Sequence, residues 1–125
     1  MDTTGYEHLQ FERRPHGVLL ITINRPDKLN AANDRLHWEL SQVWKDVSDD
    51  PDTRAAVVTG AGRAFSAGGD LDMIERQMGH YPSIVQIMKE AGDIVYNIAH
   101  CEKPIVSAIN GVAVGAGLAV ALMAD

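Results

Sequence analysis

The sequence is poor in three features that would mark a special class of protein. It holds a single cysteine, Cys101, so an internal disulfide is excluded and nothing demands an oxidising compartment. No apolar run reaches the roughly 18 residues that a membrane span needs, and the polar stretch from Met1 to Arg14 does not have the pattern of a signal peptide. We therefore expect a cytoplasmic protein.

Positive charge is also scarce, with 11 basic against 17 acidic residues and a formal net charge of −6. Nucleic acids and anionic membranes favour a basic face, so neither is an expected partner. Aromatic residues are few as well, at 6% against 46% hydrophobic residues overall, which favours aliphatic, layered α/β packing over an all-β sandwich. No linker or low-complexity tract divides residues 1–125, and one domain is expected.

The first half of the chain predicts a ββαβ order. Residues 6–13 and 18–24 are predicted strands, and Pro15-His16-Gly17 between them is typical of a hairpin turn. A helix is predicted behind a cap at Asn33 or Asp34, ending near Ser48. Its apolar residues recur at helical spacing: Leu36, Leu40, Val43 and Val47. Residues 55–59 then form a short apolar run that indicates a buried strand.

The second half predicts three more helices and one strand. A short helix over 71–78 is expected to end at Gly79-His80-Tyr81-Pro82, with Met73 and Met78 in the core. A longer helix should place six residues on one buried face: Ile84, Ile87, Met88, Ala91, Val95 and Ile98. Residues 104–109 form an apolar strand, and the small apolar residues in 114–125 predict a buried helix.

Two glycine-containing turns each lead from a strand into a helix. The first, Ala64-Phe65-Ser66-Ala67-Gly68-Gly69-Asp70, permits close backbone approach to a ligand, or is a tight turn capped by Asp70. The second, from Asn110 to Leu118, opens a small-residue helix and equally fits tight helix–strand packing. N–H groups at a helix start lack internal partners. Two such starts could supply the paired donors of an oxyanion hole.

Three ordered motifs resemble those of the crotonase (enoyl-CoA hydratase/isomerase) superfamily over nearly the whole chain. The motifs are Asn24-Arg25-Pro26 with Leu29-Asn30-Ala31, then Ala64 to Leu71, then Pro104 to Gly111 with Gly115-Ala116-Gly117. The resemblance implies a spiral of ββα units, of which residues 1–125 would be the N-terminal part of a single domain, incomplete at the C-terminus. It also implies a trimer or hexamer for the intact protein.

The same resemblance implies an acyl-CoA substrate, as in fatty acid metabolism, and no prosthetic group. The thioester oxygen would be held by the backbone N–H groups of Gly69 and Ala116, where the family usually has glycine at the latter position. Coenzyme A would lie near Arg25 and the backbone of Lys28, Leu29 and Ala31. Its thioester arm would pass Ala67, Asp70 and Leu71.

One departure from the family pattern bears on the reaction. Hydratases of the family carry a glutamate in the helix after the Gly-Ala-Gly turn, and this sequence has Ala119, which cannot transfer a proton. The second family glutamate would lie beyond Asp125. We therefore expect an acyl-CoA lyase or isomerase of this family whose reaction is not two-glutamate hydration, with a non-catalytic acyl-CoA-binding or structural protein as the alternative.

Other functions fit the sequence less well. A dinucleotide-dependent oxidoreductase would use Gly115-Ala116-Gly117 as a phosphate-binding turn, but Val120 stands where the motif needs glycine or alanine, and no acidic ribose ligand follows. The five histidines show no metal-ligand spacing and are predicted to be structural or solvated: His8, His16, His37, His80 and His100. Asp70 and Asp72 are more simply helix-start residues than a cation site.

Overall fold

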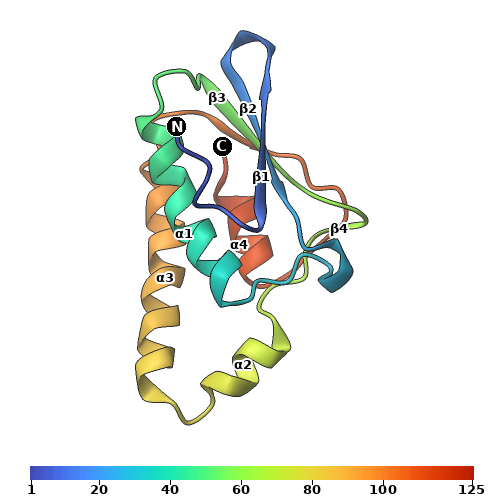
Figure 1. Ribbon diagram of the computed structural model, residues 1–125, viewed down its shortest axis with the longest axis vertical. Coiled ribbons are helices and arrows are strands. Elements are labelled where there is room, and N and C mark those ends of the chain that lie inside the picture. The colour runs from blue at the N-terminus through green and yellow to red at the C-terminus, as the bar shows by residue number, and fades with distance from the viewer.

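A mixed four-stranded sheet is the frame of the molecule, in the order β1-β2-β3-β5 (Figure 1). The computed structural model describes residues 1–125. β1 (Leu9–Arg14) runs antiparallel to β2 (Val18–Ile23), as the predicted hairpin requires. β3 (Ala55–Gly60) pairs in parallel with β2, and β5 (Ile105–Ser107) pairs in parallel with β3. Buried and half-buried residues alternate along β2 and β3, so one face of the sheet meets the core.

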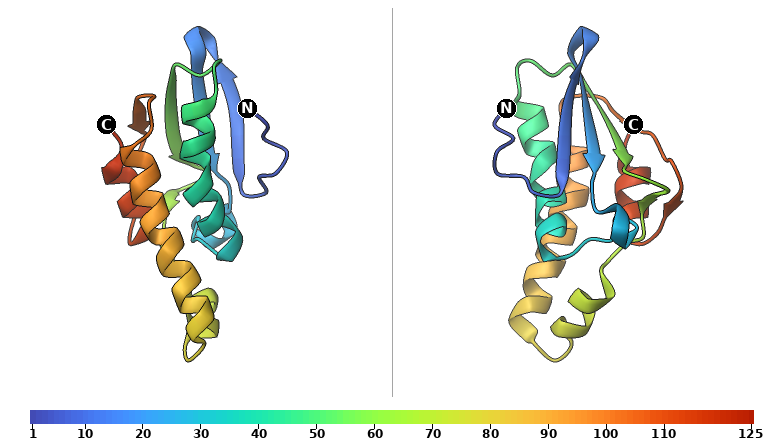
Figure 2. Two further views of the ribbon diagram at one scale, coloured as in Figure 1. Left: turned by 90° about the vertical axis from the view of Figure 1, so that its left-hand side faces the viewer. Right: turned by 45° about the vertical axis from the view of Figure 1, so that its right-hand side comes forward.

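Two helices cover that face of the sheet. α1 (Asp34–Asp49) begins at Asn33, whose side chain accepts the N–H of Leu36, and the predicted cap is thereby confirmed. Its apolar stripe is buried as predicted, over Leu36, Leu40, Val43 and Val47. α3 (Tyr81–Ala99) lies beside α1, and its first turns extend past the sheet to meet α2 (Leu71–Gln77) (Figure 2). None of the helices combines the length and apolar character that a bilayer-spanning segment needs.

A second, two-stranded parallel sheet joins β4 (Ala64–Ser66) to β6 (Val112–Ala113), and neither strand was predicted. Each strand lies inside a segment interpreted as a glycine-rich turn. α2 follows β4 and α4 (Ala116–Met123) follows β6, so both short strands deliver the chain to a helix start. Because the strands are paired, the two helix starts are held beside each other.

Several predictions for the second half were wrong in detail. The buried face of α3 is centred on Ile87, Glu90, Ile94 and Ile98, because this is the face that contacts α1 and α4. Met88, predicted to be on the buried face, is 64% exposed. The short helix α2 does end before Gly79, as predicted, but Tyr81-Pro82 already forms the first turn of α3, where proline is tolerated. Met78 is exposed although Met73 is buried, and α4 buries three of its eight residues: Gly117, Val120 and Ala121.

Candidate functional site

The loop after β2 folds tightly around one buried asparagine. A short 3-10 turn (Pro26–Lys28) leads into Leu29 and Asn30, which have positive φ values of 52° and 56°. The Asn30 side chain accepts the N–H of Arg25 at 2.8 Å and donates to the carbonyls of Ala61 and Ala64 at 2.9 and 2.8 Å. Asparagine tolerates this left-handed conformation better than most residues. The side chain therefore fixes residues 25–31 against the segment that contains β4.

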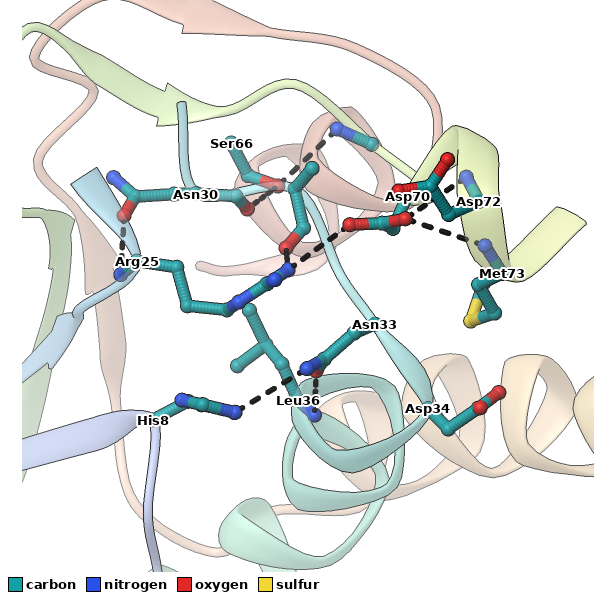
Figure 3. A network of polar contacts seen from close by, with 12 residues as sticks. His8, Arg25, Asn30, Asn33, Asp34, Leu36, Ser66, Asp70, Asp72 and Met73 are labelled. Carbon is teal, nitrogen blue, oxygen red and sulfur yellow. Dashed lines mark hydrogen bonds and ion pairs between the residues drawn. The ribbon is translucent and has the colours of Figure 1, made fainter. Parts of the chain in front are cut away.

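Ser66 ties the same loop to the first glycine turn (Figure 3). Its hydroxyl donates to the carbonyl of Asn30 at 2.8 Å and accepts the N–H of Gly68 at 3.3 Å. The backbone repeats the link, because the N–H of Ala67 donates to the carbonyl of Leu29 at 3.0 Å. Residues 25–31 and 64–70, two of the three motifs found in the sequence, therefore form one rigid unit.

Asp70 caps α2 and binds the loop from the other side (Figure 3). One carboxylate oxygen accepts the N–H groups of Asp72 and Met73, and the other lies 3.4 Å from the guanidinium of Arg25. Burial raises the pKa of Asp70, but the Met73 N–H and the Arg25 guanidinium more than offset it, so that the pKa lies below the ordinary 3.8. Arg25 also donates to the carbonyl of Ala31, which leaves its charge largely engaged within the protein.

The two helix starts meet through glycines. Gly68 and Gly115 both have positive φ, and a Cβ built on Gly115 would lie 3.6 Å from the Cα of Gly68. A Cβ on Gly117 would lie 2.5 Å from the Cβ of Ser66, so α4 packs directly on β4. The tight-packing interpretation of the glycine turns holds at these positions, and close approach to a ligand stays a prediction.

Two backbone donors at this junction have no acceptor. The N–H of Gly69, just before the α2 cap, and that of Ala116, at the first position of α4, donate to no group in the protein. The N–H of Asp70 donates to the carbonyl of Ala32 and that of Gly117 to Val114, whereas the N–H groups of Leu71 and Gly115, at the same helix starts, also find no acceptor in the protein. A helix start carries the positive end of the helix dipole, so Ala116 offers a polarised donor.

A pocket of about 440 Å³ opens beside the first turn. It is lined by Lys28, Ala31, Ala67, Gly69, Asp70, Leu71 and Asp72. Six of the nine predicted site residues therefore line one pocket. Of the other three, Arg25 and Leu29 support its wall without lining it, and Ala116 lies elsewhere. Lys28 makes no ion pair and is the free cation of this pocket.

A second pocket, of about 260 Å³, adjoins the second turn. It is lined by His37, Ala91, Ile94, Val95, Gly115, Ala116 and Ala119. His37 is its only titratable residue, and its Nδ1 lies 2.8 Å from a carboxylate oxygen of Glu90. His37 was predicted to be structural or solvated, and Glu90 was not singled out in the sequence. The one local signal was an acidic residue placed between Ile87 and Ile94 on the apolar stripe of α3.

The described residues bring no three histidine, cysteine, aspartate or glutamate side chains together in a way that could hold a metal ion. Cys101 is half-buried against the core. The chemistry available at the two pockets therefore rests on backbone donors, the side chains of Lys28 and His37, and the carboxylates of Asp70 and Asp72.

The sequence model of the family described as "Enoyl-CoA hydratase/isomerase" matches residues 13–125. A 1,2-epoxyphenylacetyl-CoA isomerase from Escherichia coli is 40% identical over 111 residues, which are 87% of this chain and 42% of that protein. A mevalonyl-coenzyme A hydratase from Beauveria bassiana is 35% identical over 122 residues, covering 90% of this chain and 42% of that one.

Solved structures agree with these relatives. An enoyl-CoA hydratase/isomerase from Mycobacterium paratuberculosis superposes with a TM-score of 0.89 at 41% sequence identity. The match covers 94% of this chain and 47% of that one, so the crotonase-like fold expected from the motifs is confirmed over the N-terminal part. The chain spans less than half of the length of each of these three relatives.

Proposed function

Since the chain belongs to the enoyl-CoA hydratase/isomerase family, we propose that it binds an acyl-CoA thioester and stabilises negative charge on the thioester oxygen. The charge would develop in an enolate or in a tetrahedral intermediate. Backbone N–H groups preorganised around such an oxygen act in a partly dry site, where they stabilise charge far more than water does. The proposal concerns the full-length protein to which these residues belong.

The unpartnered N–H groups of Gly69 and Ala116 carry this proposal. Each sits in a turn that touches the other turn through Gly68 and Gly115. A donor left without an acceptor is costly in a folded protein unless water or a ligand satisfies it. A carbonyl oxygen placed between the two turns would accept both hydrogen bonds. Ala116 lines the second pocket, and its N–H meets no protein acceptor.

The two pockets suggest how the substrate would lie. Gly69 lines the larger pocket and Ala116 the smaller, more apolar one, so a thioester held by both would project into each. The coenzyme A arm would occupy the pocket that contains Ala67 and Leu71. Lys28 would meet its phosphates, because Arg25 is engaged with Asp70 and Ala31. The acyl chain would occupy the pocket lined by Ile94 and Val95.

The reaction is proposed to be a double-bond shift or another enolate reaction rather than two-glutamate hydration. Ala119 lines the acyl-side pocket at the position where hydratases carry a glutamate, and alanine supplies no proton. The same substitution favours the alternative of a non-catalytic acyl-CoA-binding protein. Oligomeric state and location in the cell stay predictions, with a trimer or hexamer expected from the family.

Replacing Ala116 with proline tests the donor role directly. Proline is well accepted at the first position of a helix, and it replaces the amide hydrogen with a ring carbon, so that the donor is lost and its place is filled. We expect Ala116→Pro to lower turnover of an acyl-CoA by about 100-fold or more, as the loss of one oxyanion donor does elsewhere. Exchange of the α-protons of the thioester with D2O, followed by NMR, would measure the effect whichever overall reaction the protein catalyses.

The control is Ala116→Gly, which keeps the N–H and should retain exchange within about threefold of the parent. Circular dichroism would show that both variants fold. Equal exchange rates in the proline and glycine variants would exclude Ala116 as a donor. Failure of the parent protein to bind any acyl-CoA by calorimetry would exclude the proposed function altogether.

A further inference from the structure

A buried histidine–glutamate pair forms the polar part of the acyl-side pocket. His37 from α1 and Glu90 from α3 have side chains only 6% and 10% exposed, and they meet at 2.8 Å between Nδ1 and Oε1. The other carboxylate oxygen of Glu90 accepts a hydrogen bond from the Gln86 side chain at 2.8 Å. Burying a polar pair between two helices has a desolvation cost, which its own hydrogen bonds have to offset. Apolar residues in such a position are often as stable or more stable, so a buried polar pair that is kept points to a function.

The second nitrogen of the His37 ring is free. Nε2 has no hydrogen-bond partner in the protein, whereas Nδ1 is engaged by the carboxylate. His37 lines the pocket and Glu90 does not, and Nε2 lies on the side of the ring away from the Nδ1 that meets Glu90. A neutral imidazole that donates through Nδ1 to a carboxylate has a basic lone pair on Nε2. This is the arrangement in which a carboxylate orients a histidine for proton transfer.

The position of the pair relates it to the proposed thioester site. The pocket that contains His37 also contains Ala116, the proposed oxygen donor, and Ala119, where the family carboxylate is absent. All its remaining lining residues are aliphatic or glycine. Among the residues of this chain, His37 is therefore the one group on that pocket able to accept or return a proton.

We propose that His37, oriented by Glu90, is the acid–base residue that moves protons along the acyl chain of the bound thioester. The inference rests on the proposed function. Nε2 takes a proton from the α-carbon, and the electron pair of that C–H bond forms the C=C bond of an enolate. The resulting negative oxygen is held by Gly69 and Ala116. In a β,γ-unsaturated substrate the imidazolium returns the proton to the γ-carbon, which shifts the double bond without consuming water or any oxidant.

The test uses the full-length protein with 3-hexenoyl-CoA in D2O, and follows both α-proton exchange and the double-bond shift by NMR. For His37→Gln we expect kcat to fall about 100-fold or more with KM within about threefold of the parent, in line with the usual contribution of general acid–base catalysis. Glu90→Gln keeps an acceptor for Nδ1 but loses the charge, and should lower kcat by about 10-fold. His100→Gln, on the exposed end of α3, is the matched control and should match the parent.

Chemical rescue separates a proton-transfer role from a structural one. His37→Ala leaves space for free imidazole, and added imidazole should restore exchange by about 10-fold or more. This readout also decides the matter if His37→Gln folds poorly. Exchange by His37→Gln within about threefold of the parent, an effect confined to KM, or absence of imidazole rescue would each overturn the inference. If the parent protein binds acyl-CoA but does not exchange α-protons, the role of His37 is excluded and thioester binding is still supported. If the parent protein binds no acyl-CoA, both proposals are excluded.

Discussion

Among single residues, Asp50 is a carboxylate fully enclosed by donors. It lies just after α1 with a side chain that is 0% exposed, and it accepts the Arg13 guanidinium at 2.8 Å and the Thr53 hydroxyl. Burial by itself raises the pKa of Asp50, but the hydrogen bonds from Thr53 and Arg13 outweigh it and hold the pKa well below the ordinary 3.8. Asp50 thus ties β1 to the connection between α1 and β3.

Asp50→Asn should lower the free energy of unfolding by about 3 kcal/mol near neutral pH, because it leaves buried donors and the Arg13 charge poorly matched. A carboxyl with a lowered native pKa stabilises the fold above its unfolded pKa and loses that effect as pH falls through the native pKa. The difference from the parent should therefore shrink below about pH 4, as urea unfolding at about pH 7, 5 and 3 would measure. Asp52→Asn, at an exposed neighbouring position, is the control. A difference in the free energy of unfolding between Asp50→Asn and the parent that does not change with pH would contradict this role of Asp50.

Residue-level predictions succeeded where the cause is local. Asn33 and Asp70 were identified as helix caps because a cap bonds to N–H groups two or three residues away. Asp50 and His37 gave no comparable signal, since the partners that explain them are 37 and 53 residues distant in the chain. A buried ion pair between separate elements cannot be found from spacing alone.

At the scale of elements, the packing of α4 on β4 depends on a missing side chain. Gly117 lies in the first turn of α4, and a Cβ there would come within 2.6 Å of the carbonyl oxygen of Ser66. That contact fixes the distance between the first and second turns of the site. Gly92, in the middle of α3, has no atom within 4 Å of the corresponding position and is a natural comparison.

Gly117→Ala should lower the free energy of unfolding by about 1–3 kcal/mol, because overpacking outweighs the gain in helix propensity. It should also weaken acyl-CoA binding, since α4 would shift with the N–H of Ala116. Gly92→Ala should instead raise the free energy of unfolding by about 1 kcal/mol, from propensity alone. Denaturant titration and calorimetry of the two variants would measure both effects. Equal stabilisation by both substitutions would show that α4 is free to move.

Elements were predicted well where their own residues mark them. The hairpin follows from strand-forming residues on both sides of a turn, α1 from helical spacing and β3 from a short apolar run. By contrast, β4 and β6 contain three and two residues and exist only because Ala64 pairs with Val112. The face of α3 was misplaced for a similar reason. Its sequence is apolar on more than one side, and the positions of α1 and α4 decide which side is buried.

For the molecule as a whole, the side formed by α4, β5 and their connection exposes many apolar side chains. Its residues are more than 40% exposed at Val106, Ile109, Val112, Val114, Leu118 and Leu122. A surface with this much apolar area is prone to association. The matched segment is less than half the length of the relatives, so a protein of their length would have further residues available to cover this surface.

Residues 1–125 expressed by themselves should therefore self-associate and bind a hydrophobic dye. Leu122→Glu, which places a charge on an exposed apolar position, should shift the chain towards a monomer in size-exclusion chromatography with light scattering. Lys89→Glu changes charge on an exposed polar position of α3 and should have no such effect. A parent chain that stays monomeric across the concentration range would argue that this surface does not drive association.

The family was predictable at this scale because three motifs keep their order along the chain, and that order does not depend on packing. The motifs could not predict which of them contact one another in the folded protein. The pairing of β4 with β6 brings Gly68 to Gly115, and no spacing rule predicts a contact between segments so far apart.

The two pockets share no lining residue, and this separation has an evolutionary consequence. In the proposed arrangement, one surface recognises the coenzyme that all substrates carry, and another recognises the acyl group that differs among them. Substitutions at Ala91, Ile94 or Val95 would then alter substrate range while coenzyme recognition is inherited unchanged. Duplicated copies of such a gene could diverge in metabolic role through a few positions on α3.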